Sequence, residues 1–110
     1  MSKLNKCERI QRKKLLVRFN QDGGQLFSDE STGTTVAVMP VNPEFRKHKF
    51  AMVSTSFCSL NDKWSRKYGE YRALMRMYQG EYLKMPVPNT PDKFGFIAAR
   101  VMELYGMCEV

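Results

Sequence analysis

The stretch SLNDKWSRKYGEYRALMRMYQG, residues 59–80, decides the fold that the sequence predicts. Its large apolar residues follow one another at steps of four, three, four and three positions, which aligns them in one stripe along an α-helix. These residues are Trp64, Tyr68, Tyr71, Met75 and Tyr78. An apolar stripe of this kind is normally buried, so we expect the helix to pack against a sheet, with Ser59 or Asn61 as its N-cap.

Strands are expected in the segment that precedes this helix. The alternation of residues 15–20 places three apolar side chains on one face. The Asp-Gly-Gly turn at residues 22–24 would then close a hairpin onto a return strand that begins near residues 26–27. Residues 34–39 and 50–57 are predicted as further strands, because they are rich in β-branched side chains or alternate with period two.

A second long helix is expected near the C-terminus. Thr90, Pro91 and Asp92 combine an N-cap hydroxyl, a proline at the first helical position and an acid in the first turn. Prolines before this point predict an extended connection. Residues 94–105 then show the apolar face of a helix, which Gly106 would end.

These elements predict an α+β fold in which a three- or four-stranded antiparallel sheet carries two long helices packed on one face. A chain of 110 residues is long enough for one core and too short for two ordinary domains. We therefore expect a single domain over residues 15–110. Residues 1–14 are either a basic N-terminal arm or a short helix.

The chain is basic, with 18 Lys and Arg residues against 11 Asp and Glu and a net charge of +7. Such an excess favours a polyanionic partner, although dispersed lysines that only aid solubility give the same total. Two clusters favour binding: residues 3–14 hold six cations against one acid, and residues 46–76 hold eight against two. The partner that we expect is nucleic acid or a protein complex that processes it.

The sequence shows no motif for catalysis, a cofactor or a metal site. The three cysteines lack CxxC spacing, and His48 is the only histidine, so paired metal ligands are missing. No nucleotide-binding glycine motif or zinc-protease motif occurs. We expect a protein without enzymatic activity, cofactor or metal. The cysteine usage and the lack of a long apolar run predict a cytoplasmic protein without a membrane span.

The predicted binding surface consists of a basic loop and the basic first turns of the central helix. If the strand at residues 50–57 is extended, these two regions lie about 20 Å apart, a span that fits phosphates on either side of a groove. The alternative is that both are merely solvated. The candidate binding residues are Arg46, Lys47, His48, Lys49, Lys63, Arg66, Lys67, Arg72 and Arg76.

The run FCSLNDKWSRKYG, residues 57–69, resembles a motif of small phage-encoded accessory proteins. In that motif a strand ends in Cys-Ser and is followed by Asp, an aromatic residue, Ser or Asn, two basic residues and a helical Gly. The resemblance implies a viral origin and a bacterial host cell as the location. Small phage proteins often interfere with host nucleases, defence systems or transcription, so it also implies a host partner.

The chain also resembles the double-stranded RNA-binding domain, which is a helix, three antiparallel strands and a helix. The family has a basic loop, matched loosely by residues 43–50, and a Ser-Lys-Lys-rich start of its last helix, matched by Ser65, Arg66 and Lys67. Glu70 stands where the family has a third basic residue, and the C-terminal helix is extra. The resemblance implies that Arg66, Lys67 and the loop at residues 46–49 contact phosphates.

Two functions follow from these observations. The first is a nucleic-acid-binding module, with duplex RNA as the ligand that the second resemblance implies. The alternative is a protein-binding inhibitor of a host nucleoprotein defence machine, such as an anti-CRISPR protein or a nuclease inhibitor. A basic chain is a poor mimic of DNA, so an inhibitor of this kind would cover an acidic protein patch instead.

Overall fold

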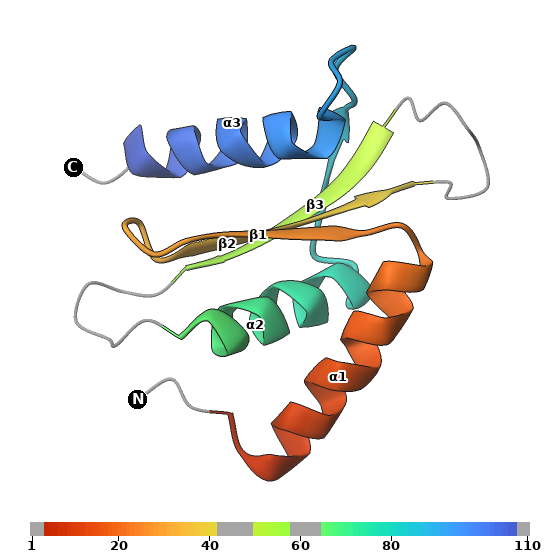
Figure 1. Ribbon diagram of the computed structural model, residues 1–110, viewed down its shortest axis with the longest axis vertical. Helices are drawn as coiled ribbons and strands as arrows, with labels where there is room; N and C mark the ends of the chain where they lie inside the picture. Colours follow the sequence, from red (N-terminus) through yellow and green to blue (C-terminus); the bar gives the residue numbers. More distant parts are fainter. Residues whose placement is uncertain (1–3, 42–49, 58–64, 108–110) are drawn as a thin grey trace.

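The computed structural model describes residues 4–41, 50–57 and 65–107 (Figure 1). In chain order the elements are α1 (Lys6–Gln21), β1 (Gln25–Asp29), β2 (Thr34–Pro40), β3 (Phe50–Phe57), α2 (Arg66–Tyr78), β4 (Leu83–Pro86) and α3 (Lys93–Met107). The described strands form a four-stranded antiparallel sheet in the order β1-β2-β3-β4. The predicted α+β class and antiparallel sheet are therefore confirmed.

A capping box starts α1. The Asn5 side chain accepts a hydrogen bond from the Glu8 backbone N–H at 2.8 Å, and the Glu8 carboxylate accepts one from the Asn5 N–H at 3.0 Å. This pair satisfies two donors that the first turn of a helix otherwise leaves open. Of the two alternatives for residues 1–14, the helix is present from Lys6 onward, and it continues to Gln21.

The predicted strand at residues 15–20 is wrong, because these residues form the last turns of α1. Leu15 and Phe19 are four positions apart, so the pair that fits one face of a strand also fits one face of a helix. Phe19 is fully buried in the core between the helices and the sheet. Gly23, with φ at +80°, follows the end of α1 instead of turning a hairpin.

The first hairpin of the sheet is formed by β1 and β2, which follow the position of the predicted hairpin in the chain. β1 and β2 pair from Gln25 opposite Val38 to Asp29 opposite Thr34. The turn between them is closed by the Asp29 carboxylate, which accepts hydrogen bonds from the backbone N–H and the hydroxyl of Ser31 at 3.0 and 2.6 Å. These hydrogen bonds lower the pKa of Asp29, the Ser31 hydroxyl contributing most.

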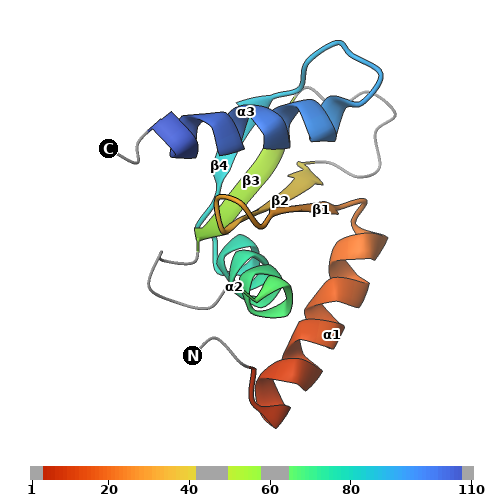
Figure 2. The ribbon, with the colours of Figure 1, turned by 60° about the vertical axis from the view of Figure 1, so that its left-hand side comes forward.

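Alternate residues of β2 belong to two separate cores, one on each face of the sheet. Val36 and Val38 pack with α3, whereas Ala37 and Met39 pack with α1 and α2. Figures 1 and 2 show the same arrangement, with α3 over one face and α1 and α2 against the other. The prediction that both long helices share one face is therefore wrong. All seven residues of β2 are buried, which is typical of a strand in a sheet covered on both sides.

The C-terminal helix starts close to its predicted position. Asp92 is the capping residue, and its side chain accepts a hydrogen bond from the Gly95 backbone N–H at 3.2 Å. Of the predicted inward residues of α3, Ile97, Ala98 and Val101 are buried, whereas Phe94 is half-buried and Leu104 is 55% exposed. Gly106 does not end the helix, which continues to Met107. Part of the predicted extended connection before α3 is the edge strand β4.

α2 presents a different face to the sheet than the one that the sequence predicted. Its N-cap is Ser65, whose hydroxyl accepts a hydrogen bond from the Tyr68 N–H at 3.3 Å, so the helix begins later than expected. The described members of the predicted stripe are only half-buried, and Trp64 lies outside the described residues. The side chains that α2 buries are Glu70, Ala73, Leu74 and Met77.

A close approach at Gly69 explains this orientation. A Cβ atom added to Gly69 would overlap the Thr35 hydroxyl of β2. Beside this point the hydroxyls of Ser56 and Ser54 in β3 donate hydrogen bonds to the carbonyls of Gly69 and Ala73 at 2.9 and 2.7 Å. Because Gly69 and Ala73 lie against the serines of β3, the bulky tyrosines are turned to the flanks of the helix.

We predict that Gly69→Ala destabilises the protein, although alanine normally stabilises the interior of a helix by about 1 kcal/mol relative to glycine. The free energy of unfolding should fall by about 1–3 kcal/mol, because the added methyl group overlaps Thr35. Urea denaturation measures the change. The double variant Gly69→Ala, Thr35→Ala should recover part of the loss, since it removes the hydroxyl. A single variant as stable as the parent would contradict the close approach.

Candidate functional site

The positive charge of the protein is concentrated on α1 and α2. These two helices carry ten of the 18 Lys and Arg residues and two of the 11 Asp and Glu residues, which is a net charge of +8. All other residues together carry eight cations and nine acids. α1 and α2 lie on the same side of the sheet (Figure 2). The cations of the helices are Lys6, Arg9, Arg12, Lys13, Lys14, Arg18, Arg66, Lys67, Arg72 and Arg76.

The structure places four of the nine predicted binding residues. Arg66 and Lys67 are exposed in the first turn of α2. Arg72 is exposed on the side of α2 that carries Tyr68, and its guanidinium lies 5.8 Å from the centre of the Tyr68 ring. Arg76 is turned toward β3. The remaining predicted residues, Arg46, Lys47, His48, Lys49 and Lys63, lie outside the described residues.

A cavity of about 420 Å³ lies between the N-terminal half of α1 and the start of α2. We call it the α1–α2 cleft. Four of its lining side chains are cations from two helices that are far apart in the sequence. Such a hollow attracts anions, because low-dielectric walls of one charge sign focus the electric field. The lining residues are Leu4, Arg9, Arg12, Lys13, Ser65 and Lys67.

The cleft brings Lys67 together with residues that sequence reasoning had not selected. Arg9, Arg12 and Lys13 belong to the basic segment at residues 1–14. The sequence left two alternatives for that segment, an N-terminal arm or a short helix. The spacing of these cations by three and four positions puts them on one side of a helix. The capping box of Asn5 and Glu8 was the signal that predicts this helix.

A buried ion pair joins the two helices at the cleft. The Arg12 guanidinium lies 3.2 Å from the Glu70 carboxylate, and their side chains are only 15% and 10% exposed. The second Glu70 oxygen lies 3.6 Å from Arg66. Arg12 Nε is buried and has no hydrogen-bond partner among the described residues. Glu70 thus holds two cations in place while neutralising only one of the charges gathered there.

Tyrosines of the predicted apolar stripe join α2 to α1 further along. The Tyr71 hydroxyl donates a hydrogen bond to the Gln11 side chain at 2.9 Å, and the Tyr78 hydroxyl donates one to the Asp22 carboxylate at 2.9 Å. The Arg18 guanidinium lies 4.4 Å from the centre of the Tyr78 ring. Burial raises the pKa of both tyrosines. The stripe therefore joins two helices instead of forming the sheet core.

The described residues offer little for catalysis or metal binding. Among them, no group of three His, Cys, Asp or Glu side chains is arranged to hold a metal ion. Cys7 is an exposed free thiol on α1. Within the same part of the chain, no helix combines the length and apolar character needed to cross a membrane. The chemical feature that the described residues do provide is the cationic surface of α1 and α2.

Comparisons with models of known protein families, with curated proteins and with solved structures found no significant match. The geometry of α1, α2 and the cleft between them is therefore the main guide to function.

We predict that Tyr78→Phe changes how stability depends on pH. Burial, followed by the hydrogen bond to Asp22, raises the pKa of Tyr78 above the ordinary tyrosine value of about 10. A group whose pKa is higher in the folded state contributes stability below its unfolded pKa and loses it as the pH rises through the folded value. The parent should therefore lose stability above about pH 10, and the variant should lose less.

Urea denaturation across this pH range measures the effect. At neutral pH the variant should lose about 0.5–1.5 kcal/mol for the missing hydrogen bond. Tyr82→Phe is the matched control, because the Tyr82 hydroxyl has no hydrogen bond within the described part of the chain. Equal pH profiles for the parent and Tyr78→Phe would show that this tyrosine does not join the helices.

Proposed function

We propose that the protein is a non-enzymatic module that binds nucleic acid, and specifically duplex RNA, through the face formed by α1 and α2. The observation that carries the proposal is the concentration of ten cations and only two acids on these adjoining helices. Phosphate contacts supply most of the affinity of non-specific nucleic-acid binding, and Lys and Arg are the side chains that make them.

The shape of the face suits a duplex better than a flexible single strand. Proteins that bind single strands without sequence preference stack bases on exposed aromatic side chains. Here Tyr71 and Tyr78 are occupied in joining the helices. A face of cations whose described tyrosines are engaged in this way is suited to phosphates held at fixed positions along a groove.

The order of elements supports duplex RNA as the ligand. The first five elements are a helix, three antiparallel strands and a helix, which is the order in the double-stranded RNA-binding domain. Arg66 and Lys67 begin the second of these helices, where the resemblance implies phosphate contacts. β4 and α3 are additions, and they lie beyond the element pattern on which the resemblance rests.

A protein partner is a second candidate, favoured by one observation on α1. Ile10 and Val17 are 48% and 58% exposed, and they lie seven positions apart on the outer side of this cationic helix. Exposed apolar residues among cations also fit an acidic protein surface. The resemblance to phage accessory proteins suggests which partner to test. It is a host nuclease or a host defence complex of the kind that an anti-CRISPR protein binds.

Fluorescence anisotropy with labelled duplex RNA at several salt concentrations tests the proposal. We predict that Lys13→Gln, Lys67→Gln weakens binding and that each lost phosphate contact reduces the slope of log K against log salt by about 0.7–0.9. The control is Lys93→Gln, Arg100→Gln on α3, which changes the net charge equally on the other side of the sheet. Its affinity should stay close to that of the parent.

Two results would contradict the proposal. Equal losses of affinity in both double variants would mean that only the net charge matters. The absence of any binding to duplex RNA at low salt would refute the proposal directly. A duplex DNA of the same sequence, bound as well or better, would exclude RNA as the specific ligand. A pull-down from bacterial lysate that retains one protein after nuclease treatment would select the protein partner instead.

A further inference from the structure

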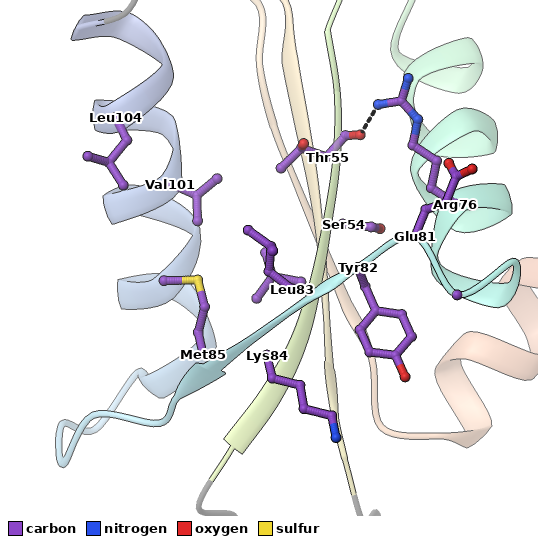
Figure 3. Close-up of a pocket in the computed structure, with 12 residues that line it drawn as sticks. Ser54, Thr55, Arg76, Glu81, Tyr82, Leu83, Lys84, Met85, Val101 and Leu104 are labelled. Atoms are coloured by element: carbon purple, nitrogen blue, oxygen red, sulfur yellow. Dashed lines mark hydrogen bonds between the residues drawn. The ribbon is translucent and has the colours of Figure 1, made fainter.

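A hollow of about 800 Å³ lies at the edge of the sheet where β4 begins (Figure 3). β3 and β4 form its floor, with α3 on one side and the end of α2 on the other. Leu83 and Leu104 are 70% and 55% exposed here, and the less exposed Met85 and Val101 lie beside them. Exposed leucines around an apolar hollow are typical of a surface that another molecule covers.

The same hollow carries charges of both signs on its α2 side. Arg76 donates a hydrogen bond to the Thr55 carbonyl oxygen at 2.6 Å, which fixes its guanidinium at the rim. Glu81 follows the end of α2 and is exposed. Within the described residues, neither Arg76 nor Glu81 has an oppositely charged group within 4.0 Å. One rim therefore offers a positive and a negative group beside an apolar floor.

A surface that offers an apolar floor and one charged group of each sign can meet a second copy of itself. In a two-fold symmetric contact each patch meets its own copy, so Glu81 of one copy would face Arg76 of the other. The net charge of +8 on α1 and α2 opposes association through that face, whereas the rest of the chain is nearly neutral. A second copy that approaches by β4 and α3 avoids most of this repulsion.

We propose that the occupant of the hollow is a second copy of this chain. In the resulting two-fold dimer, Leu83 and Leu104 of each copy enter the hollow of the other. Side chains make this contact, because the edge strand β4 is short and contains Lys84 and Pro86, residues that oppose direct strand pairing. The inference does not depend on the proposed function, since the one α2 cation that it uses, Arg76, is turned toward β3 and does not line the α1–α2 cleft.

Sedimentation velocity of the full chain, over concentrations up to about 100 µM, tests the proposal. We expect a concentration-dependent dimer and a dissociation constant at least about tenfold higher for both Leu83→Glu and Leu104→Glu. Phe96→Glu is the matched control, because Phe96 is a 48% exposed apolar residue of the same helix α3 and does not line the hollow. Circular dichroism checks that each variant is folded.

A charge exchange tests the orientation of the two copies. Glu81→Arg alone should weaken the dimer, and the double variant Glu81→Arg, Arg76→Glu should restore it, because opposite charges then face each other again. A monomer throughout the concentration range would overturn the proposal. A dimer that both leucine variants leave unchanged, or binding of an unrelated amphiphilic molecule by a protein that stays monomeric, would overturn it as well.

Discussion

The close contact between α2 and the sheet at Gly69 determines how the rest of the molecule is arranged. With no side chain at this position, the helix backbone reaches the Thr35 hydroxyl and accepts hydrogen bonds from Ser54 and Ser56. This fixes the rotation of α2 about its own axis. Tyr71 and Tyr78 are then turned toward α1, and so is the start of the helix with Lys67.

The buried pair of Arg12 and Glu70 is a consequence of the same rotation. A charge taken out of water is expensive unless it is paired, so neither side chain is readily replaced alone. Replacing both by apolar residues would keep the packing. It would also remove the only acidic residue of α2, which lies among the cations of the two helices. Glu70 therefore allows two positively charged helices to lie side by side and still leaves a net positive surface.

Much of the fold was predictable from the sequence, and the failures share a physical cause. The limits of β3 were predicted correctly, because the alternation of its residues with period two left no competing assignment. Leu15 and Phe19 fit a strand and a helix equally well, and only the capping box at the helix start decides between them. The tyrosine stripe has helical spacing, yet spacing does not say whether a sheet or another helix covers it.

The candidate site was harder to predict, because it depends on which segments meet. Lys67 was selected from its position at a helix start, but its neighbours Arg9 and Lys13 come from a helix more than fifty residues earlier. Their assembly follows from α1 and α2 sharing one face of the sheet, which no local pattern specifies.

Dimerisation at the apolar hollow would change how the cationic face binds a ligand. The cationic face lies on the α1–α2 side of the sheet, and the apolar hollow lies at the β4 edge beside α3. A dimer formed at the hollow would therefore leave both cationic faces accessible and hold them in a fixed relation. Two linked faces bind a long polyanion more tightly than one, because the second contact forms at a high effective concentration. That gain exists only if the spacing of the two faces matches phosphates on one duplex, so the geometry of the dimer would select the ligand as much as the charges do.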